Sequence, residues 1–341
     1  MTTSWHLRPG DGIASLTRRE SARTEPGPGE VRVSLRANSI NARDLMTAIG
    51  HSPLPAADDL IPLSDGAGVV DAIGEGVTRV AVGDRVVITF NPVHQTGAYE
   101  PYMEANALGG MRQGLLREET TLEEMAVVPL PDAISFEQAA CLPCAALVAW
   151  NALFETGSLK PGQTVVAVGT GAVSLIALSL ARAAGARVGV TSSDDSKLER
   201  AREYGAHFGV NYRERTDWDV AVREATSGHG ADVVLETAGP PSVATAVRAA
   251  AQGGLVAQIG FKGMEGPAVS MLDMALGGVS LRPVMVGSRA MLERLVAAVA
   301  VNDIKLPVHS RHNYEEAPTA FETALSGDTF GKVVITQEGD R

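Results

Sequence analysis

Residues 164–174, which read TVVAVGTGAVS, contain the pattern that decides the fold. The run 164–168 is uncharged and rich in β-branched side chains, which is typical of a strand buried on both faces of a parallel sheet. Gly169 and Gly171 then predict a tight turn, and the apolar, alanine-rich stretch that reaches Ala184 predicts a helix. A buried strand that enters a helix through a glycine turn indicates the first half of a βαβ unit.

Strands and helices keep alternating on the C-terminal side of this unit. The pattern predicts a helix at 195–204 and further strands at 187–191, 208–211, 232–236, 255–259 and 281–286. Such alternation is typical of a doubly wound parallel sheet, so we expect an α/β fold.

A β-rich segment precedes the parallel sheet. Glycine turns separate short runs that predict strands at 31–35, 69–73 and 85–90. Residues 91–111 contain Pro, Gly, His and Tyr and predict a long surface loop, a feature that is often functional. After the parallel sheet, the sequence predicts a helix at 314–325 and a strand at 332–336.

The composition limits the classes of function. The chain has 341 residues, which suggests two domains, and its 29 Lys and Arg against 40 Asp and Glu give a net charge of −11. Nucleic-acid binding needs a basic face, so we expect no nucleic-acid partner.

Residues 1–10 lack a signal-peptide pattern and no apolar run approaches about 20 residues, so we expect a cytoplasmic protein without a membrane partner. The two cysteines, Cys141 and Cys144, cannot form a disulfide framework.

The glycine turn has the pattern of a dinucleotide-binding loop. Gly169 would allow the tight turn, and Gly171 would let backbone amides approach a pyrophosphate at the positive end of the helix. The third glycine of this pattern is replaced by Ser174, and a plain structural turn stays open as the alternative. The residues that we predict to contact a cofactor here are Gly169, Thr170, Gly171, Ala172 and Val173.

The end of the strand at 187–191 predicts which cofactor binds. An acidic residue there would bind the ribose hydroxyl of NAD, whereas hydroxyls and cations suit the extra phosphate of NADP. Asp194 and Asp195 argue for NAD, but they lie where a helix N-cap is expected. Lys197 and Arg213 could also be ordinary surface charges. We predict NADP(H), with the phosphate held by Ser192, Ser193, Lys197 and Tyr212.

Several motifs occur in a characteristic order along the chain. They are SINARDL at 39–45, IPLSDGAG at 61–68, GEGV at 74–77, VGDRV at 82–86, LKPG at 159–162 and GKVV at 331–334. With the glycine turn, they resemble the medium-chain dehydrogenase/reductase superfamily, and most closely its zinc-free, quinone-oxidoreductase-like branch. The resemblance implies a GroES-like catalytic domain at 1–130, completed by a return segment at 287–341. It also implies a Rossmann NADP(H)-binding domain at 131–286, with the active site in the cleft between the domains.

The resemblance also points to a site without zinc. The catalytic zinc of the superfamily binds a Cys, a His followed by Glu, and a second Cys. The matching positions here are Asn41, Ser64 with Asp65, and Cys144. One thiol with neutral amide and hydroxyl groups is a poor zinc site, so we predict no metal. Cys141 and Cys144 match a Cys-x-x-Cys redox motif, but their apolar neighbourhood favours two buried core thiols.

Further cofactor contacts follow from the resemblance alone. They are Val148, Thr237, Ala238, Ile259, Gly260, Phe261, Gly287, Ser288 and Lys332. Glycine, serine and threonine are also common in structural turns between strands and helices, so these positions have that alternative. Because several of them follow the carboxyl ends of strands, cofactor binding is favoured.

The polar candidates for catalysis are Asn41, Asp44, Ser64 and Asp65. Two hydroxyls that are common in this branch are missing, because the positions hold Ala42 and Val148. Burial would raise the pKa of either aspartate and allow it to act as a general acid. Alternatively, both aspartates are structural and pair with Arg43 or Arg85. Loop residues that could form a lid or lie in solvent are His51, His94, Tyr99 and Tyr102.

These residues lead to hypotheses of different classes. The first is a zinc-independent, NADPH-dependent oxidoreductase that reduces a small conjugated carbonyl compound, an enone or a quinone, by hydride transfer. The second is an NADP(H)-binding protein with a redox-neutral or non-catalytic role in a biosynthetic pathway, and a zinc-free alcohol dehydrogenase stays open beside it. The resemblance also implies a homodimer joined through the strand at 279–286, in which Pro283 must face away from the pairing side.

Overall fold

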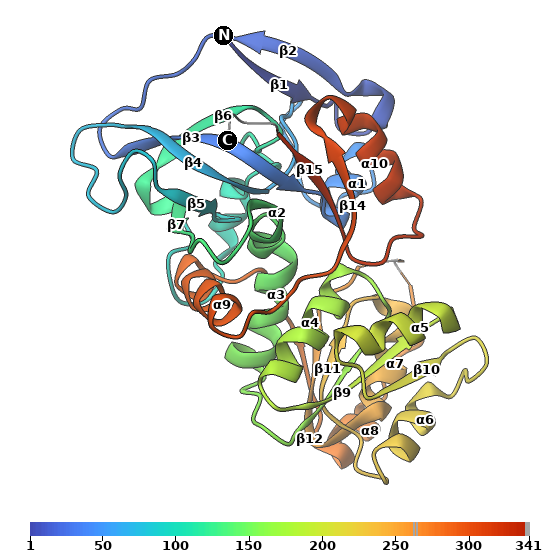
Figure 1. Cartoon of the computed structure of the whole chain (residues 1–341). Helices are drawn as coiled ribbons and strands as arrows, with labels where there is room; N and C mark the ends of the chain where they lie inside the picture. The colour runs from blue at the N-terminus through green and yellow to red at the C-terminus, as the bar shows by residue number, and fades with distance from the viewer. Residues whose placement is uncertain (262, 264, 338–341) are drawn as a thin grey trace. The chain divides into compact units, whose positions relative to one another are not determined.

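The structure is a computed structural model that describes residues 1–261, 263 and 265–337, and these form two compact units (Figure 1). The first unit comprises Met1–Leu147, Val286–Asp303 and the chain from Val308 onward, and the second comprises Val148–Met285 and Ile304–Pro307. Residues 131–147, which we expected with the nucleotide-binding domain, therefore pack with the first unit. The division of binding roles between the predicted domains stays a prediction.

The second unit is built on a parallel sheet. Its strands are ordered β10-β9-β8-β11-β12-β13, with the bounds Phe208–Asn211, Arg187–Ser192, Thr164–Ala167, Ala231–Glu236, Ala250–Gln258 and Ser280–Pro283. Strand order reverses between β8 and β11, as it does in a doubly wound nucleotide-binding sheet. The predicted α/β Rossmann architecture is therefore confirmed.

Helices cover both sides of this sheet in the second unit (Figure 1). They are α4 Ala172–Ala183, α5 Asp195–Ala201, α6 Trp218–Ala225, α7 Pro240–Ala249 and α8 Met271–Gly277. Helix α4 buries Leu175, Ile176 and Leu178, so the strand, turn and helix predicted from residues 164–174 all form. Val166 and Val234 from the sheet join α6 and α7 in a shared hydrophobic core.

The first unit is built on a mixed sheet in the order β14-β15-β3-β4-β5-β7, and β6 also pairs with β3. In chain order the bounds are β3 Glu30–Ser39, β4 Asp65–Ile73, β5 Arg85–Ile88, β6 Glu119–Glu123, β7 Val127–Pro129, β14 Val308–Asn313 and β15 Lys332–Thr336. Strands β14 and β15 are parallel, and the other neighbours are antiparallel. Alternating residues such as Val31, Val33 and Leu35 fill the core, which is the pattern that predicted this β-rich domain.

Other elements of the first unit surround this sheet. They are the antiparallel pair β1 Thr2–His6 and β2 Thr17–Ser21, and the helices α1 Ala42–Ala48, α2 Phe136–Ala139, α9 Arg289–Val301 and α10 Ala317–Leu325. Helix α3, Leu147–Trp150, lies where the chain passes from one unit to the other. The sequence analysis did not predict the β1–β2 pair or α9.

The segment 91–111 is in part the surface loop that the sequence predicted, since Tyr102 and Met111 are exposed, but other parts of it are buried. It contains the 3₁₀ helix Pro101–Asn106 and buries the side chains of His94, Met103 and Leu108. The Arg289 amide donates to the His94 carbonyl oxygen (2.9 Å), so this segment packs on the start of α9. Proline and glycine correctly marked turns here, but they do not reveal whether neighbouring side chains are buried.

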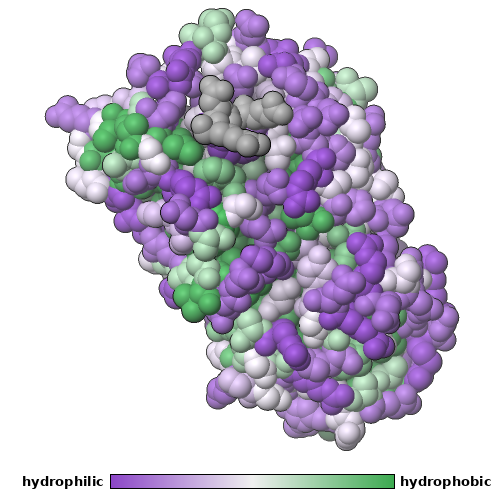
Figure 2. All heavy atoms as spheres, viewed as in Figure 1, coloured by the Kyte–Doolittle hydropathy of each residue, from purple (hydrophilic) through white to green (hydrophobic). Residues whose placement is uncertain are grey.

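The face drawn in Figure 2 is largely hydrophilic, with hydrophobic residues in separate groups. This agrees with a chain that carries 69 charged side chains, the sum of 29 basic and 40 acidic residues. Within the described part of the chain, no helix has both the length and the apolar character needed to cross a bilayer.

Candidate functional site

The glycine turn after β8 leaves open space at the start of α4. Gly169 adopts φ +81°, which favours glycine, and its amide donates to Thr191 Oγ1 (3.1 Å). Gly171 is the N-cap of α4, and a Cβ at this position would have no neighbour within 4 Å beyond the adjacent residues and its own helix. Open space beside the first-turn amides of a helix fits a pyrophosphate, so the residues present suit the predicted cofactor.

Ser174, which replaces the third glycine of the pattern, is fully buried against this turn. Its hydroxyl donates to the Val168 carbonyl oxygen (2.9 Å) and lies 3.1 Å from Thr237 Oγ1. Thr237 Oγ1 donates to the same carbonyl oxygen at 2.5 Å. Two hydroxyls therefore join the end of β8 to the end of β11, and the turn keeps its shape without the third glycine.

Glu236, the last residue of β11, is a buried acid that the sequence analysis missed. Its carboxylate accepts hydrogen bonds from the amides of Ala238 (3.0 Å) and Gly239 (2.7 Å) and from the Ser242 hydroxyl. Burial raises the pKa of Glu236, and these hydrogen bonds oppose that shift. The carboxylate holds the backbone of the predicted cofactor-binding residues 237–238. An acid directly before a Thr-Ala-Gly turn was the available signal.

The ends of β11 and β12 are in direct contact. The amides of Ile259 (2.8 Å) and Gly260 (2.9 Å) both donate to the Glu236 carbonyl oxygen. A Cβ on Gly260 would lie 2.2 Å from the Thr237 carbonyl group, so glycine is required for this close approach. Phe261 follows on the surface. The structure thus brings the predicted residues after β8, β11 and β12 to one edge of the sheet, where doubly wound folds bind ligands.

The end of β9 carries the residues predicted to select the cofactor. Asp194 caps α5 by accepting from the Ser196 amide (2.8 Å), and Asp195 accepts from Asn211 Nδ2 (2.9 Å). Both carboxylates are therefore engaged in structural hydrogen bonds, as expected of an N-cap. The Tyr212 amide donates to the Ser192 carbonyl oxygen (2.9 Å), which brings these two predicted residues together. Ser193 and Lys197 are half-buried at the same strand end.

In the first unit, a buried polar cluster forms around Lys332, the first residue of β15. The side chain of Lys332 is 2% exposed. Its ammonium donates to the carbonyl oxygen of Ile40 (2.8 Å) and to Asn41 Oδ1 (2.5 Å), and it lies 3.6 Å from Asp65 Oδ2. Three oxygen atoms therefore surround this buried charge. The resemblance predicted Lys332 as a cofactor contact, and the structure places it among the predicted catalytic residues.

The hydrogen bonds around Lys332 fix the orientation of Asn41 and Ser64. An ammonium only donates, so the Asn41 atom beside it must be the oxygen, and Asn41 Nδ2 faces Ser64 Oγ at 3.5 Å. The Ser64 hydroxyl donates to Asp65 Oδ1 (2.8 Å), and the Ser39 hydroxyl lies 3.3 Å from Asp65 Oδ2. Asn41 thus offers N–H groups, and Asp65 is the ion-pair partner of Lys332.

Asp44 occupies the first turn of α1 and is fully buried. Its Oδ2 accepts from the Asn41 amide (2.8 Å), which caps the helix, while its Oδ1 has no hydrogen-bond partner among the described residues. Burial raises the pKa of Asp44 to about 6, against the opposing effects of Arg43 and of this hydrogen bond. Arg85, the other predicted partner of these aspartates, instead pairs with Asp132 (3.2 Å). Asp44 is the candidate acid of the cluster.

The chain is similar to known proteins along nearly its whole length. Residues 27–132 match the alcohol dehydrogenase GroES-like domain, and residues 172–301 match the zinc-binding dehydrogenase domain. A zinc-type alcohol dehydrogenase-like protein of Schizosaccharomyces pombe is 38% identical over 90% of this chain and 91% of its own length. The chain belongs to the medium-chain dehydrogenase/reductase superfamily.

Other members of this superfamily differ in the reaction for which they are named. A quinone oxidoreductase of Pseudomonas aeruginosa is 30% identical over 95% of this chain and 96% of its own length. A solved NAD-dependent alcohol dehydrogenase is 31% identical, with a TM-score of 0.88 over 98% of this chain and 99% of that chain. The chain is therefore similar to oxidoreductases of both kinds, and the choice between them depends on its own site residues.

The superfamily's zinc position is a poor metal site in this member. Asn41 Oδ1, the metal-binding atom of that side chain, is occupied by the Lys332 ammonium, and the Ser64 hydroxyl is directed to Asp65. Burial raises the pKa of the Cys144 thiol, which disfavours the thiolate that zinc would need. Within the described residues, no three His, Cys, Asp or Glu side chains are arranged to hold a metal.

The remaining predicted positions have structural contacts. Val148 is buried, and a Cβ on Gly287 would lie 2.7 Å from Met291 Sδ. The Ser288 hydroxyl accepts from the Met291 amide (3.4 Å) as the N-cap of α9. Burial raises the pKa of Cys141 to about 12, in keeping with a core thiol. Cofactor contact at these positions stays a prediction.

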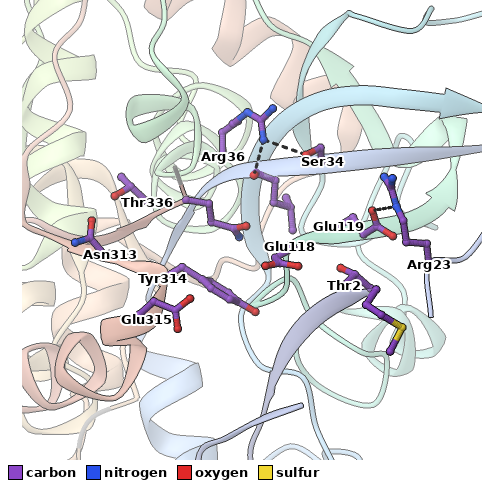
Figure 3. Close-up of a pocket in the computed structure, with 13 residues that line it drawn as sticks. Thr2, Arg23, Ser34, Arg36, Glu118, Glu119, Asn313, Tyr314, Glu315 and Thr336 are labelled. Atoms are coloured by element: carbon purple, nitrogen blue, oxygen red, sulfur yellow. Dashed lines mark hydrogen bonds and ion pairs between the residues drawn. The ribbon is translucent and has the colours of Figure 1, made fainter. Parts of the chain in front are cut away.

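A separate pocket of about 510 Å³ lies in the first unit (Figure 3). Its lining includes Arg23, Arg36 and Glu119, and Arg23 donates to the neighbouring Glu119 (2.7 Å). No predicted site residue lines this pocket. Since Arg23 pairs with Glu119, Arg36 donates to the Ser34 hydroxyl, and none of the predicted catalytic residues lies here, we do not assign the reaction to it.

Proposed function

We propose that the chain is a zinc-independent, NADPH-dependent oxidoreductase that reduces a small conjugated carbonyl compound, an enone or a quinone. The supporting observation is the buried Lys332 ammonium, which donates a hydrogen bond to Asn41 Oδ1. Asn41 is the residue whose position matches a zinc ligand of the superfamily. Oxidation of an alcohol needs a group that takes the hydroxyl proton, whereas a conjugated carbonyl accepts hydride without one. The cluster supplies hydrogen-bond donors and a weak acid, which suit the second reaction.

NADP(H), when bound, supplies the hydride. The residues that we assign to the pyrophosphate are the turn 169–173 and the first-turn amides of α4. We assign further cofactor contacts to 237–238 and 259–261, and Gly287 and Ser288 to the nicotinamide. For the 2′-phosphate we assign Ser192, Ser193, Lys197 and Tyr212. Support comes from the hydroxyls of Ser192 and Ser193 and from Lys197, which lie at this strand end, where hydroxyls and cations suit a phosphate. Asp194 and Asp195 each accept a structural hydrogen bond through Oδ1.

Asn41 and Asp44 have distinct roles in the proposed reaction. The β-carbon of the substrate accepts the hydride with its two electrons, negative charge develops on the carbonyl oxygen, and a proton completes the α-carbon. Asn41 Nδ2 donates a hydrogen bond to that oxygen, and Lys332 holds the amide in this orientation. Water supplies the proton, with Asp44 as a donor at pH values near or below its pKa of about 6.

A homodimer formed through the second unit completes the proposal. Helix α8 exposes Met271 (75%), Leu272 (65%) and Leu276 (71%) beside the open edge strand β13. The Val284 amide donates to the Gln258 carbonyl oxygen (2.9 Å), so the alternating amide directions of a strand put the Pro283 nitrogen on the open edge. The open edge therefore lacks a hydrogen-bond donor at Pro283. The sequence analysis required Pro283 to face away from the side that pairs with a second copy, and this requirement is not met. We therefore assign the contact mainly to the apolar side chains of α8.

The experiment that tests this function is cofactor binding followed by turnover. Fluorescence titration with NADPH and NADH should show tighter binding of NADPH, and the bound protein should then oxidise NADPH with an enone or a quinone. Tight NADPH binding without turnover of any enone, quinone, aldehyde or ketone would instead support the non-reducing alternative. Turnover of a simple alcohol with NADP⁺ at a higher rate would establish an alcohol dehydrogenase.

A further inference from the structure

Arg43 has a cationic side chain for which the described residues supply no anionic partner. It lies in the first turn of α1, between Asn41 and Asp44. Its Nη1 is buried without a hydrogen-bond partner, and none of the described carboxylates lies within ion-pair distance of the guanidinium. Several arginines of the first unit have carboxylate partners, such as Arg85 with Asp132 and Arg289 with Glu293. Arg117 resembles Arg43 in having a buried nitrogen without a partner among the described residues, but it donates to the Thr120 hydroxyl.

The surroundings of Arg43 hold the guanidinium in place without satisfying its donors. Its central carbon lies 4.8 Å from the centre of the Phe90 ring, which supports one face. A Cβ on Gly110 would lie 2.9 Å from Nη2, so the glycine leaves room for the group. The charge of Arg43 also acts on Asp44, Tyr99 and Cys144, which places it close to the polar cluster.

A buried guanidinium donor without a partner is unfavourable, and an arriving anion removes that cost. The planar fork of Arg matches the two oxygens of a carboxylate. Asp44 does not serve, because its Oδ2 accepts from the Asn41 amide and neither oxygen reaches the guanidinium. The position is therefore suited to a carboxylate that comes with a ligand.

We infer that Arg43 binds a carboxylate of the substrate, so that the preferred substrate is a small conjugated carbonyl compound that also carries an acid group. This inference rests on the proposed function. The charges of Arg43 and of Lys332, which holds Asn41, act on the same two groups, Asp44 and Cys144, so the guanidinium and the Asn41 amide lie around one cluster. A short molecule can then place its carbonyl oxygen at Asn41 and its carboxylate at Arg43. Phosphate oxygens of the cofactor have related chemistry, and the experiment separates the two sources.

The test compares acetylacrylate with its methyl ester as substrates, with NADPH as reductant. The wild-type enzyme should have a kcat/KM for the acid at least about tenfold above that for the ester, which corresponds to about 1.4 kcal/mol. In Arg43→Met, which keeps side-chain length, the preference should disappear, chiefly through a higher KM for the acid. Arg43→Lys should keep part of the preference. Arg79→Met, which removes a surface ion pair with Glu293, is the matched control and should keep all of it.

A binding measurement makes the result independent of turnover. Levulinate, the saturated analogue, should bind wild-type protein in calorimetry and bind Arg43→Met at least about tenfold more weakly. Equal kcat/KM for acid and ester in the wild type would overturn the inference while leaving the reductase intact. Weaker NADPH binding by Arg43→Met with an unchanged acid preference would assign the guanidinium to the cofactor. Failure to reduce either compound, with levulinate binding retained, would reject the proposed reaction but not the carboxylate site.

Discussion

At the scale of single residues, the first unit contains two buried ionisable side chains, Lys332 and Asp44, whose charged forms are stabilised by their surroundings to different degrees. Lys332 has oxygen atoms of Ile40, Asn41 and Asp65 around its ammonium, so its charge is well compensated. Asp44 has one unpartnered oxygen, and burial raises its pKa to about 6. A buried charge is tolerated when it is paired and hydrogen-bonded, and it is costly otherwise. Substitution of Lys332 should therefore lower the free energy of unfolding, whereas Asp44→Asn should gain stability relative to the wild type as the pH rises.

Lys332→Met should destabilise the protein by about 3–5 kcal/mol, because it leaves Asp65 as an uncompensated buried charge. Urea unfolding measures this loss. Adding Asp65→Asn to the same chain should recover part of it, since the second change removes the unpaired charge. Lys160→Met at an exposed site is the control and should change the free energy of unfolding by less than about 0.5 kcal/mol. A Lys332→Met protein as stable as the wild type would contradict this reading.

Asp44→Asn should gain stability relative to the wild type as the pH rises. The folded-state pKa of about 6 lies above the unfolded value of 3.8, so the folded wild type binds more protons between these values and loses stability as the pH rises through them. Asn does not titrate and avoids this loss. Between about pH 4.5 and pH 7.5, the difference between the two proteins should shift by about 2 kcal/mol in favour of the variant. A pH-independent difference in urea unfolding would show that Asp44 titrates normally.

The sequence predicted some site residues and missed others for a physical reason. Asn41, Ser64 and Asp65 lie in short motifs, and the structure does bring them together. The role of Glu236 depends on how the chain turns back after β11, and that of Lys332 depends on a contact 291 residues away in the sequence. Local patterns do not contain such long-range contacts.

At the scale of elements, β8, its glycine turn and α4 form the part of the fold most strongly determined by local sequence. The run at 164–168 is buried on both faces, and Gly169 has the positive φ that the turn requires. The segment 91–111 shows the opposite case, because its burial depends on packing against α9. The pattern of apolar residues predicts an element well when its neighbours follow closely in the chain.

Gly171→Ala should weaken NADPH binding without unfolding the protein. Gly171 has φ −76°, which alanine adopts, and nothing but a ligand would meet the added methyl group. We expect the Kd for NADPH to rise at least about tenfold, while the free energy of unfolding changes by less than about 1 kcal/mol. Gly260→Ala is the contrasting variant, because its methyl group would collide with the Thr237 carbonyl group and lower stability. Unchanged NADPH affinity in Gly171→Ala would show that the pyrophosphate does not bind at this turn.

Leu272→Glu combined with Leu276→Glu should separate the proposed dimer. Both side chains are exposed on α8, and new carboxylates there would repel each other across a symmetric contact. Light scattering should report a dimer of the wild type and a monomer of the variant. Val301→Glu is the control, because Val301 is 84% exposed on α9 in the other unit. A monomeric wild type, or a variant that stays dimeric, would exclude α8 as the contact.

At the scale of the whole molecule, the chain combines a Rossmann unit with a GroES-like unit whose buried cluster contains the Lys332 ammonium. Composition and motif order predicted this combination, and the family matches confirm the superfamily. Relatives named as alcohol dehydrogenases and as a quinone oxidoreductase share the fold, so fold alone does not select the reaction. Whether turnover needs a metal is the property that distinguishes the proposed reductase from a zinc-dependent alcohol dehydrogenase.

The most direct test is the rate of NADPH oxidation with a conjugated ketone before and after zinc is removed with a chelator, with the zinc content of each sample measured. We predict an unchanged rate in protein that contains no zinc, and a kcat/KM with NADPH at least about tenfold above that with NADH. A rate that falls with the zinc content and returns when zinc is added would contradict it.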